Sequence, residues 1–318
     1  MKRRTIIVGA LLILTLVLSV YAKQLQQASP QVSQKNQTIK VDVDLTLVNA
    51  TVLERLHGRI VTDLKVDDFE VWEDKIQQSI EYFSEEDAAI SLGVIFDVSG
   101  SMKEKLPVAR DAALAFLKTG NTEDEYFLIE FNSRPQITQD FTTDISRLQN
   151  HLMFTPAGGT TALFDATYLG LQKLRDGVNT KKALLLITDG VDNHSRYTFK
   201  NVRDFIKEQD IQLYAIGIDS QFYSYGEGQA GRALIEELTD LTGGRAFFAT
   251  SVYELPDICT KIALELKNQY VLGYRSTNGA KDGKWRRITL RVHPPAGMPD
   301  MSIRGKSGYY APTDSGNH

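Results

Sequence analysis

The segment from residue 90 to residue 268 constrains the fold most, because short apolar runs alternate there with amphipathic helical patterns. We expect strands at 90–97, 126–131, 183–188, 211–217 and 245–248. We expect helices at 105–118, 144–153, 162–175, 198–208, 231–242 and 252–268. Almost wholly apolar strands, each followed by an amphipathic helix, are typical of a parallel sheet that helices cover on both sides. The sequence therefore predicts an α/β fold with a doubly wound, mostly parallel sheet.

Segments with strand patterns flank this α/β segment at both ends. Apolar and more polar residues alternate from 41 to 48, which is the period of a half-buried strand. After residue 269, the runs 270–274 and 285–292 are predicted strands, and Asn278-Gly279 and Asp282-Gly283 between them are hairpin turn signals. The predicted division is an N-terminal β unit at 39–87, an α/β domain at 88–269, a C-terminal β unit at 270–312 and a tail at 313–318. Chain ends often lie close together, so the two β units are candidates for one small β-sandwich.

The N-terminus has the pattern of a targeting segment. Lys2-Arg3-Arg4 precedes an apolar run from Ile6 to Val20, and Val20-Tyr21-Ala22 suits signal peptidase. We predict a signal peptide at 1–22 and a Gln/Ser-rich linker at 23–38; an uncleaved N-terminal membrane anchor is the alternative. Either reading makes the protein exported, and hence periplasmic, secreted or associated with the cell envelope.

Composition excludes several functional classes. The net charge is −4 and no basic patch is evident, so we expect no nucleic-acid partner. Cys259 is the only cysteine, so no internal disulfide is possible, and we expect no disulfide-linked subunits. We place Cys259 in the helical core, and Trp72 and Trp285 in the core of the β part. Neither a Gly-x-Ser-x-Gly elbow nor a phosphate-binding loop occurs, which argues against an enzyme.

Polar residues end three separate α/β units, at the edge where doubly wound sheets bind ligands. They are Asp97-Val98-Ser99-Gly100-Ser101, Gly158-Gly159-Thr160-Thr161 and Thr188-Asp189-Gly190. Each piece alone is also typical of a helix cap or a turn. Together they offer carboxylate and hydroxyl oxygens, which hard divalent cations select. We interpret Asp192-Asn193-His194, which follows, as a solvated loop rather than a ligand set.

This ordered set resembles the metal-ion-dependent adhesion site of the von Willebrand factor type A domain, which has a Rossmann-like fold. The matching positions are Asp97, Ser99 and Ser101, then Thr161, then Asp189. Thr160 is the alternative in the second piece. The resemblance implies a bound Mg²⁺, with Mn²⁺ or Ca²⁺ as alternatives. It also implies a protein or peptide partner that supplies an Asp or Glu carboxylate.

Flanking motifs, among them Thr161-Ala162-Leu163-Phe164-Asp165-Ala166 and Gly308-Tyr309-Tyr310-Ala311, look like an exported bacterial group of such proteins known best from acidobacteria. The expected function is non-enzymatic binding of an acidic group through the metal. The alternative is a structural or assembly component of a cell-envelope complex, in which the metal site is secondary.

Overall fold

The computed structural model describes residues 45–85, 88–218 and 226–313. The predicted signal peptide and linker lie outside these residues. Within them, no helix is both long enough and apolar enough to cross a membrane.

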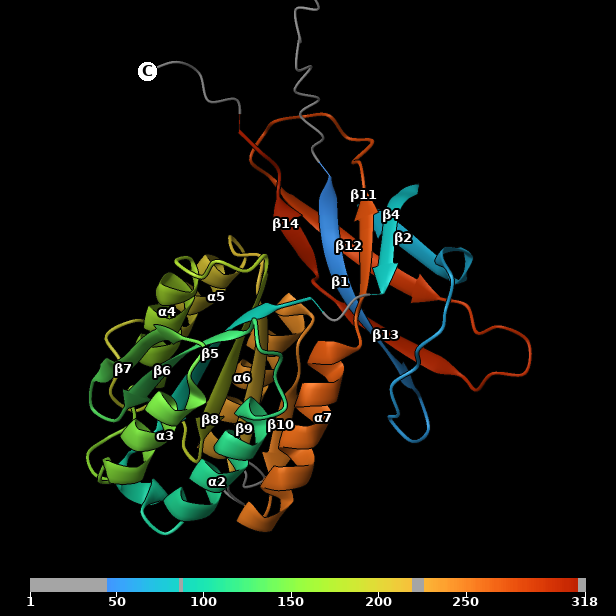
Figure 1. Ribbon diagram of the computed structural model, residues 1–318. Coiled ribbons are helices and arrows are strands. Elements are labelled where there is room, and N and C mark those ends of the chain that lie inside the picture. Colours follow the sequence, from blue (N-terminus) through green and yellow to red (C-terminus); the bar gives the residue numbers. More distant parts are fainter. Residues whose placement is uncertain (1–44, 86–87, 219–225, 314–318) are drawn as a thin grey trace, which may run out of the picture. The chain divides into compact units, whose positions relative to one another are not determined.

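A six-stranded sheet forms the centre of the α/β part (Figure 1). Its order is β10 (Ala246–Ala249), β9 (Gln212–Ile218), β8 (Lys181–Thr188), β5 (Ile90–Asp97), β6 (Glu125–Phe131) and β7 (Pro135–Thr142). All neighbours are parallel except β6 and β7, so the predicted α/β class with a mostly parallel sheet is confirmed. The antiparallel edge strand β7 was not predicted, because most of its residues are polar and none of them is buried.

Helices cover both faces of this sheet (Figure 1). One apolar cluster joins the sheet to α2 (Leu106–Leu117), α3 (Ile145–Phe154) and α7 (Leu255–Lys267). The other joins it to α4 (Leu163–Leu174), α5 (Phe199–Ile206) and α6 (Glu227–Thr242). Every residue of β5 is buried, because its side chains alternate between the two clusters: Val94 and Phe96 enter the first, and Ile95 enters the second.

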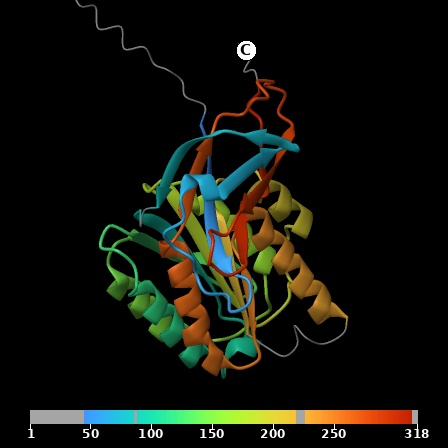
Figure 2. The same cartoon turned by 90° about the vertical axis from the view of Figure 1, so that its right-hand side faces the viewer.

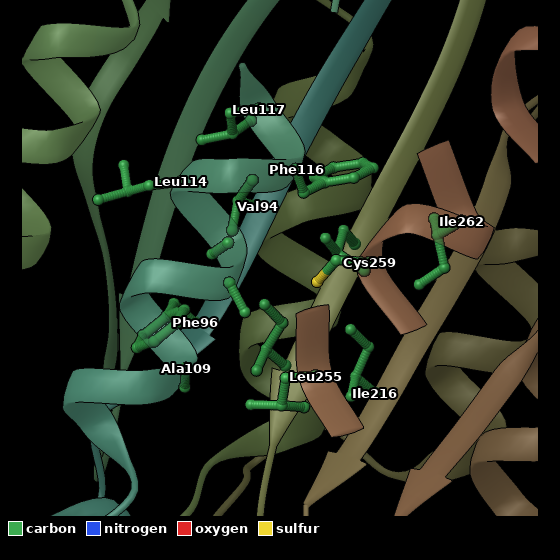
Figure 3. Packing of buried hydrophobic residues seen from close by; sticks show 14 of the residues in the cluster. Val94, Phe96, Ala109, Leu114, Phe116, Leu117, Ile216, Leu255, Cys259 and Ile262 are labelled. Carbon is green, nitrogen blue, oxygen red and sulfur yellow. The ribbon is translucent and has the colours of Figure 1, made fainter. Parts of the chain in front are cut away.

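Cys259 lies in the first cluster, where Figure 3 shows it between α7 and the sheet, close to Leu255. The side chain is 2% exposed, which confirms its predicted place in the core. Burial raises the pKa of this thiol to about 12. Cys259 is therefore a packing residue in the folded protein and not a nucleophile.

Two four-stranded antiparallel sheets form the β part (Figure 2). One has the order β13 (Met301–Gly305), β1 (Thr46–Glu54), β11 (Tyr270–Tyr274) and β4 (Ile80–Glu85). The other has the order β14 (Gly308–Tyr310), β12 (Trp285–Val292), β2 (Phe69–Glu73) and β3 (Ile76–Gln78). Each sheet mixes strands from before and after the α/β part, and both contribute to one apolar cluster that includes Val48, Phe69, Tyr270 and Ile288.

Two expectations about the β part were wrong. The strands β11 and β12 do not form a hairpin, because β11 pairs with β1 and β4, whereas β12 pairs with β2 and β14. Trp72 and Trp285 are only partly buried. Side chains alternate along β2, so Val71 and Glu73 face the core and Trp72 faces outward. Glu73 is 2% exposed and accepts hydrogen bonds from the hydroxyls of Tyr274 and Tyr309.

Candidate metal-binding site

The candidate residues meet where the order of the parallel strands reverses. From β5 the chain passes to β6 on one side, and β8 later pairs with the other side of β5. Phe96 is in register with Ile187, so Asp97 and Thr188 end neighbouring strands at the same level. The Thr188 hydroxyl donates a hydrogen bond of 2.6 Å to Oδ2 of Asp97. This is the place in a doubly wound sheet where ligands bind.

Asp97 is fully buried. Its Oδ1 accepts a 2.8 Å hydrogen bond from the backbone N–H of Ser99, which fixes the turn after β5. The pKa of Asp97 is raised from 3.8 to about 6: burial is the main cause and the nearby charge of Asp189 adds to it, whereas the hydrogen bonds from Thr188 and Ser99 partly offset the rise. The carboxylate is therefore held in a setting that disfavours its negative charge unless a cation is near.

The two serines link Asp97 to Asp189. The Ser99 and Ser101 hydroxyl oxygens lie 3.1 Å apart, and Ser101 Oγ donates to Asp189 Oδ1 at 2.8 Å. Ser99 is 1% exposed and Asp189 is 0% exposed, whereas Ser101 faces solvent. The structure thus brings four of the predicted residues together, although 88 positions separate Ser101 from Asp189 in sequence.

Backbone hydrogen bonds hold the glycine-rich loop at 158–161 against the turn that follows β5. Gly158 N–H donates to Val98 C=O at 2.8 Å, and Gly100 N–H donates to Gly159 C=O at 3.1 Å. Gly159 has a φ of +88°, and a Cβ there would lie 2.7 Å from Ser133 Oγ. The loop that carries Thr161 is therefore bonded directly to the turn that carries Ser99, and its path requires glycine.

Thr161 and Thr160 have different surroundings. Thr161 is 4% exposed, and its N–H donates to Oδ1 of Asn193 at 2.9 Å. The Asn193 N–H donates in return to Thr161 C=O at 3.0 Å. Thr160 is exposed, and its hydroxyl donates to Ser133 Oγ at 2.8 Å. Of the two threonines, Thr161 is thus the buried one, and Asn193 fixes its backbone.

Asn193 was missed as a positioning residue. The expectation of a solvated loop fits the exposed His194, but Asn193 bonds to Thr161, and Asp192 Oδ1 accepts from Phe164 N–H at 3.3 Å. Asn and Asp directly after a strand-ending Asp-Gly are a weak signal for such bonds, since the same residues are common in free turns.

Lys105 is a second residue that the motifs did not indicate. It lies just before α2, and its ammonium nitrogen is 2.7 Å from Asp189 Oδ2. Its side chain is 23% exposed. The ion pair is therefore partly shielded from water and lies beside the serine pair.

These residues fit a hard divalent cation. The described residues contain no group of three or more His, Cys, Asp or Glu side chains that could hold a metal, so a carboxylate- or imidazole-rich site is absent there. The set at the strand ends consists of three hydroxyls and two buried carboxylates, all oxygen donors. Mg²⁺ keeps several waters and needs few protein ligands, so a set with few charges suits it. The Ser99, Ser101 and Thr161 hydroxyls could contact such an ion, and Asp97 and Asp189 could balance its charge.

The family model of the von Willebrand factor type A domain matches residues 92–261. This range runs from β5 into α7 and contains all five candidate ligands. Among curated proteins, none matches the sequence.

Solved structures with a similar fold share little sequence with the chain. A von Willebrand factor type A protein from Catenulispora acidiphila is 13% identical with a TM-score of 0.50, and the match covers 78% of this chain and 74% of that one. Proximal thread matrix protein 1 from the mussel byssus is 12% identical with a TM-score of 0.50, with coverage of 61% and 51%. The von Willebrand factor domain of the type V pili tip protein Mfa5 from Porphyromonas gingivalis is 14% identical with a TM-score of 0.45, with coverage of 56% and 94%. At these identities the likeness concerns the fold alone.

Proposed function

The chain belongs to the von Willebrand factor type A domain family, and on that premise we propose that it is a non-enzymatic binding protein with a divalent-cation site at the ends of β5 and β8. The proposed ion is Mg²⁺, with Mn²⁺ and Ca²⁺ as alternatives. The proposed partner is a protein or peptide that offers an Asp or Glu carboxylate. The proposed metal-site residues are Asp97, Ser99, Ser101, Thr161 and Asp189.

The observation that carries this proposal is the burial of two carboxylates around one pair of serines. Asp97 and Asp189 are both 0% exposed. Asp97 binds the Ser99 N–H, and Asp189 binds the Ser101 hydroxyl. Removing an ion from water costs several kcal/mol unless opposite charge compensates it. Lys105 already pairs with Asp189, whereas Asp97 has no ion pair among the described residues, so a divalent cation at the serines would compensate Asp97 and add to the compensation of Asp189.

When bound, the metal supplies a positive position that an anionic oxygen of the partner occupies. The chain's own residues orient the site and set its charge. Ser99, Ser101 and Thr161 are neutral donors, so they leave most of the ion's charge available to the partner. Asp97 and Asp189 hold the serines by hydrogen bonds. The N-terminus of α4, two residues after Thr161, adds positive potential at the same edge.

The surroundings of the serines support binding rather than catalysis. A serine nucleophile needs a base within hydrogen-bond reach. The hydroxyls of Ser99 and Ser101 bond to each other, and that of Ser101 bonds to Asp189; among the described residues, neither bonds to a histidine. Assays with ester and phosphate substrates should give background rates. Turnover that disappears in Ser99→Ala would overturn the non-enzymatic assignment.

A second candidate function is a structural or assembly role in a cell-envelope complex. It is favoured by the two antiparallel sheets, all of whose strands lie outside the residues that match the family. Export, and membership of the exported bacterial group known best from acidobacteria, belong to the proposal as well. They rest on the sequence of residues 1–22 and on the flanking motifs.

Isothermal titration of MgCl₂ into the full chain tests the proposed site. We expect binding heats in the wild type and their loss in Asp97→Ala and Asp189→Ala. Asp111→Ala, which removes an exposed aspartate of α2, serves as the control and should keep the wild-type heats. Equal heats in the wild type and both aspartate variants would contradict the metal site. Partner capture that is unchanged by EDTA and by Asp97→Ala would favour the assembly role instead.

A further inference from the structure

A cavity of about 560 Å³ opens beside the candidate metal site. The residues that line it include Arg134, Asp165, Tyr168, His194, Arg196 and Tyr197. They come from the turn between β6 and β7, from α4, and from the loop between β8 and α5. We call this cavity the arginine pocket.

The arginine pocket shares its rim with the loop that carries Thr161. Ser133, which also lines the pocket, accepts hydrogen bonds from the N–H of Thr160 at 3.1 Å and from its hydroxyl at 2.8 Å. Thr160 is the direct neighbour of Thr161, and adjacent Cα atoms are about 3.8 Å apart. Asp165, in the pocket wall, lies in the first turn of α4. A chain segment bound at the metal site can therefore reach the pocket within a few residues.

Hydrogen bonds and ring contacts build the pocket wall. Asp165 is 6% exposed, and its Oδ1 accepts from the backbone N–H groups of Arg196 at 2.9 Å and Tyr197 at 2.8 Å. The rings of Tyr168 and Tyr197 stack with centroids 4.0 Å apart and an interplanar angle of 16°. The wall is thus held in place by the fold, which lowers the entropy cost of binding a ligand.

The charge facing the arginine pocket is positive. The Arg134 and Arg196 side chains are exposed, and Arg134 has no ion pair in the described part of the chain. Arg196 Nε lies 3.4 Å from Asp165 Oδ2, but the Arg196 side chain is 87% exposed and has further donors available. Asp165 is the only carboxylate that lines the pocket among the described residues. The whole chain has a net charge of −4, so the positive charge around this pocket is opposite in sign to that of the protein as a whole.

We propose that the arginine pocket binds a second acidic side chain, Asp or Glu, from the same partner segment whose first carboxylate binds the metal. This inference rests on the proposed function and names the partner more closely: a peptide segment with two acidic residues a few positions apart. Arg134 and Arg196 would pair with the second carboxylate, since guanidinium groups match carboxylates in geometry. The stacked Tyr168 and Tyr197 would contact its aliphatic stem.

The test uses synthetic peptides as probes in NMR titrations of the full chain with MgCl₂. One peptide has a single Asp in a Gly/Ser background, and the others add a Glu after one, two or three Gly residues. In the wild type, we expect at least one two-acid peptide to bind about 3- to 10-fold more tightly than the single-acid peptide. Arg134→Gln/Arg196→Gln should remove that advantage and keep the EDTA-sensitive binding of the single-acid peptide.

The control variant Arg147→Gln/Arg175→Gln removes two exposed arginines that do not line the pocket. It should keep the advantage of the two-acid peptide, and thermal melts should show that both double variants fold. The pocket proposal is contradicted if the advantage is absent in the wild type or persists in Arg134→Gln/Arg196→Gln. It is also contradicted if polygalacturonate, an acidic polysaccharide, is bound more tightly through these arginines than any peptide. Peptide binding that survives both EDTA and Asp97→Ala would instead contradict the proposed metal function.

Discussion

The Lys105 ammonium lies 2.7 Å from Oδ2 of Asp189, while Oδ1 of the same carboxylate accepts a hydrogen bond from Ser101. The charge of Lys105 thus neutralises the Asp189 carboxylate, which the proposed site would use to balance a divalent ion. The two positive charges repel each other, so binding of the ion must weaken or displace this pair. Lys105 is therefore expected to lower the affinity of the site for metal.

Lys105→Met should raise the affinity for Mg²⁺ about 3- to 10-fold in isothermal titration, because the competing ammonium is lost and the aliphatic stem is kept. Lys103→Met is the matched control, since Lys103 is an exposed lysine two positions away. It should change the affinity far less. An affinity in Lys105→Met equal to or weaker than that of the wild type would show that the lysine does not compete with the ion.

Asn193→Ala should weaken Mg²⁺ binding about 3- to 10-fold, which corresponds to the loss of one hydrogen bond of roughly 1 kcal/mol. The Asn193 side chain accepts from the Thr161 N–H and so fixes the backbone of that proposed ligand. Asn193→Asp keeps an acceptor oxygen and should bind Mg²⁺ at least as well as the wild type. If Asn193→Ala titrates like the wild type, Thr161 either is not a ligand or is positioned without this bond.

Cys259 should not react with a thiol reagent such as DTNB in the native protein at pH 8, because it is buried and its raised pKa of about 12 keeps it protonated. One thiol per chain should react after unfolding in guanidinium chloride. Rapid labelling under native conditions would mean that the packing of α7 against the sheet opens readily. The measurement is absorbance of the released thiolate over time.

The Glu54 carboxylate should make stability depend on pH in the acid range. Hydrogen bonds from Arg59 and His57 lower its pKa below the ordinary value of 4.5. A carboxyl with a lowered folded-state pKa stabilises the fold above its unfolded-state pKa, and this contribution disappears as the pH falls through the folded-state pKa. Urea unfolding at pH 7 should therefore show Glu54→Gln less stable than the wild type. At pH 3 the difference should shrink, and a constant difference from pH 7 to pH 3 would exclude this linkage.

Much of the fold follows from local sequence patterns. The runs that became β5 and β8 consist mostly of apolar residues, because both faces of these strands are buried, and such runs are easy to recognise. The polar, half-exposed β7 lacks that signal. The prediction of a hairpin between β11 and β12 failed for a different reason. Turn signals are local, whereas the pairing of β11 with β1 depends on residues more than 200 positions away.

The candidate site likewise has one part that the sequence predicts and another part that it does not. Asp97 and Asp189 could be brought together from sequence because parallel strands end at one edge of a sheet. The hydrogen bonds from Lys105 to Asp189 and from the Thr161 N–H to the Asn193 side chain could not be predicted, because they depend on side-chain directions that no spacing rule fixes. The arginine pocket is likewise formed by three segments that meet only in the folded chain.

The most direct test of the account is anomalous diffraction from crystals of the protein soaked with MnCl₂. Mn²⁺ stands in for Mg²⁺ and can be located by its own scattering. We predict one strong peak within bonding distance of the Ser99 and Ser101 hydroxyl oxygens, absent in crystals of Asp97→Ala. Well-ordered crystals with no peak at the serine pair, or with an equal peak in Asp97→Ala, would contradict the proposed metal site.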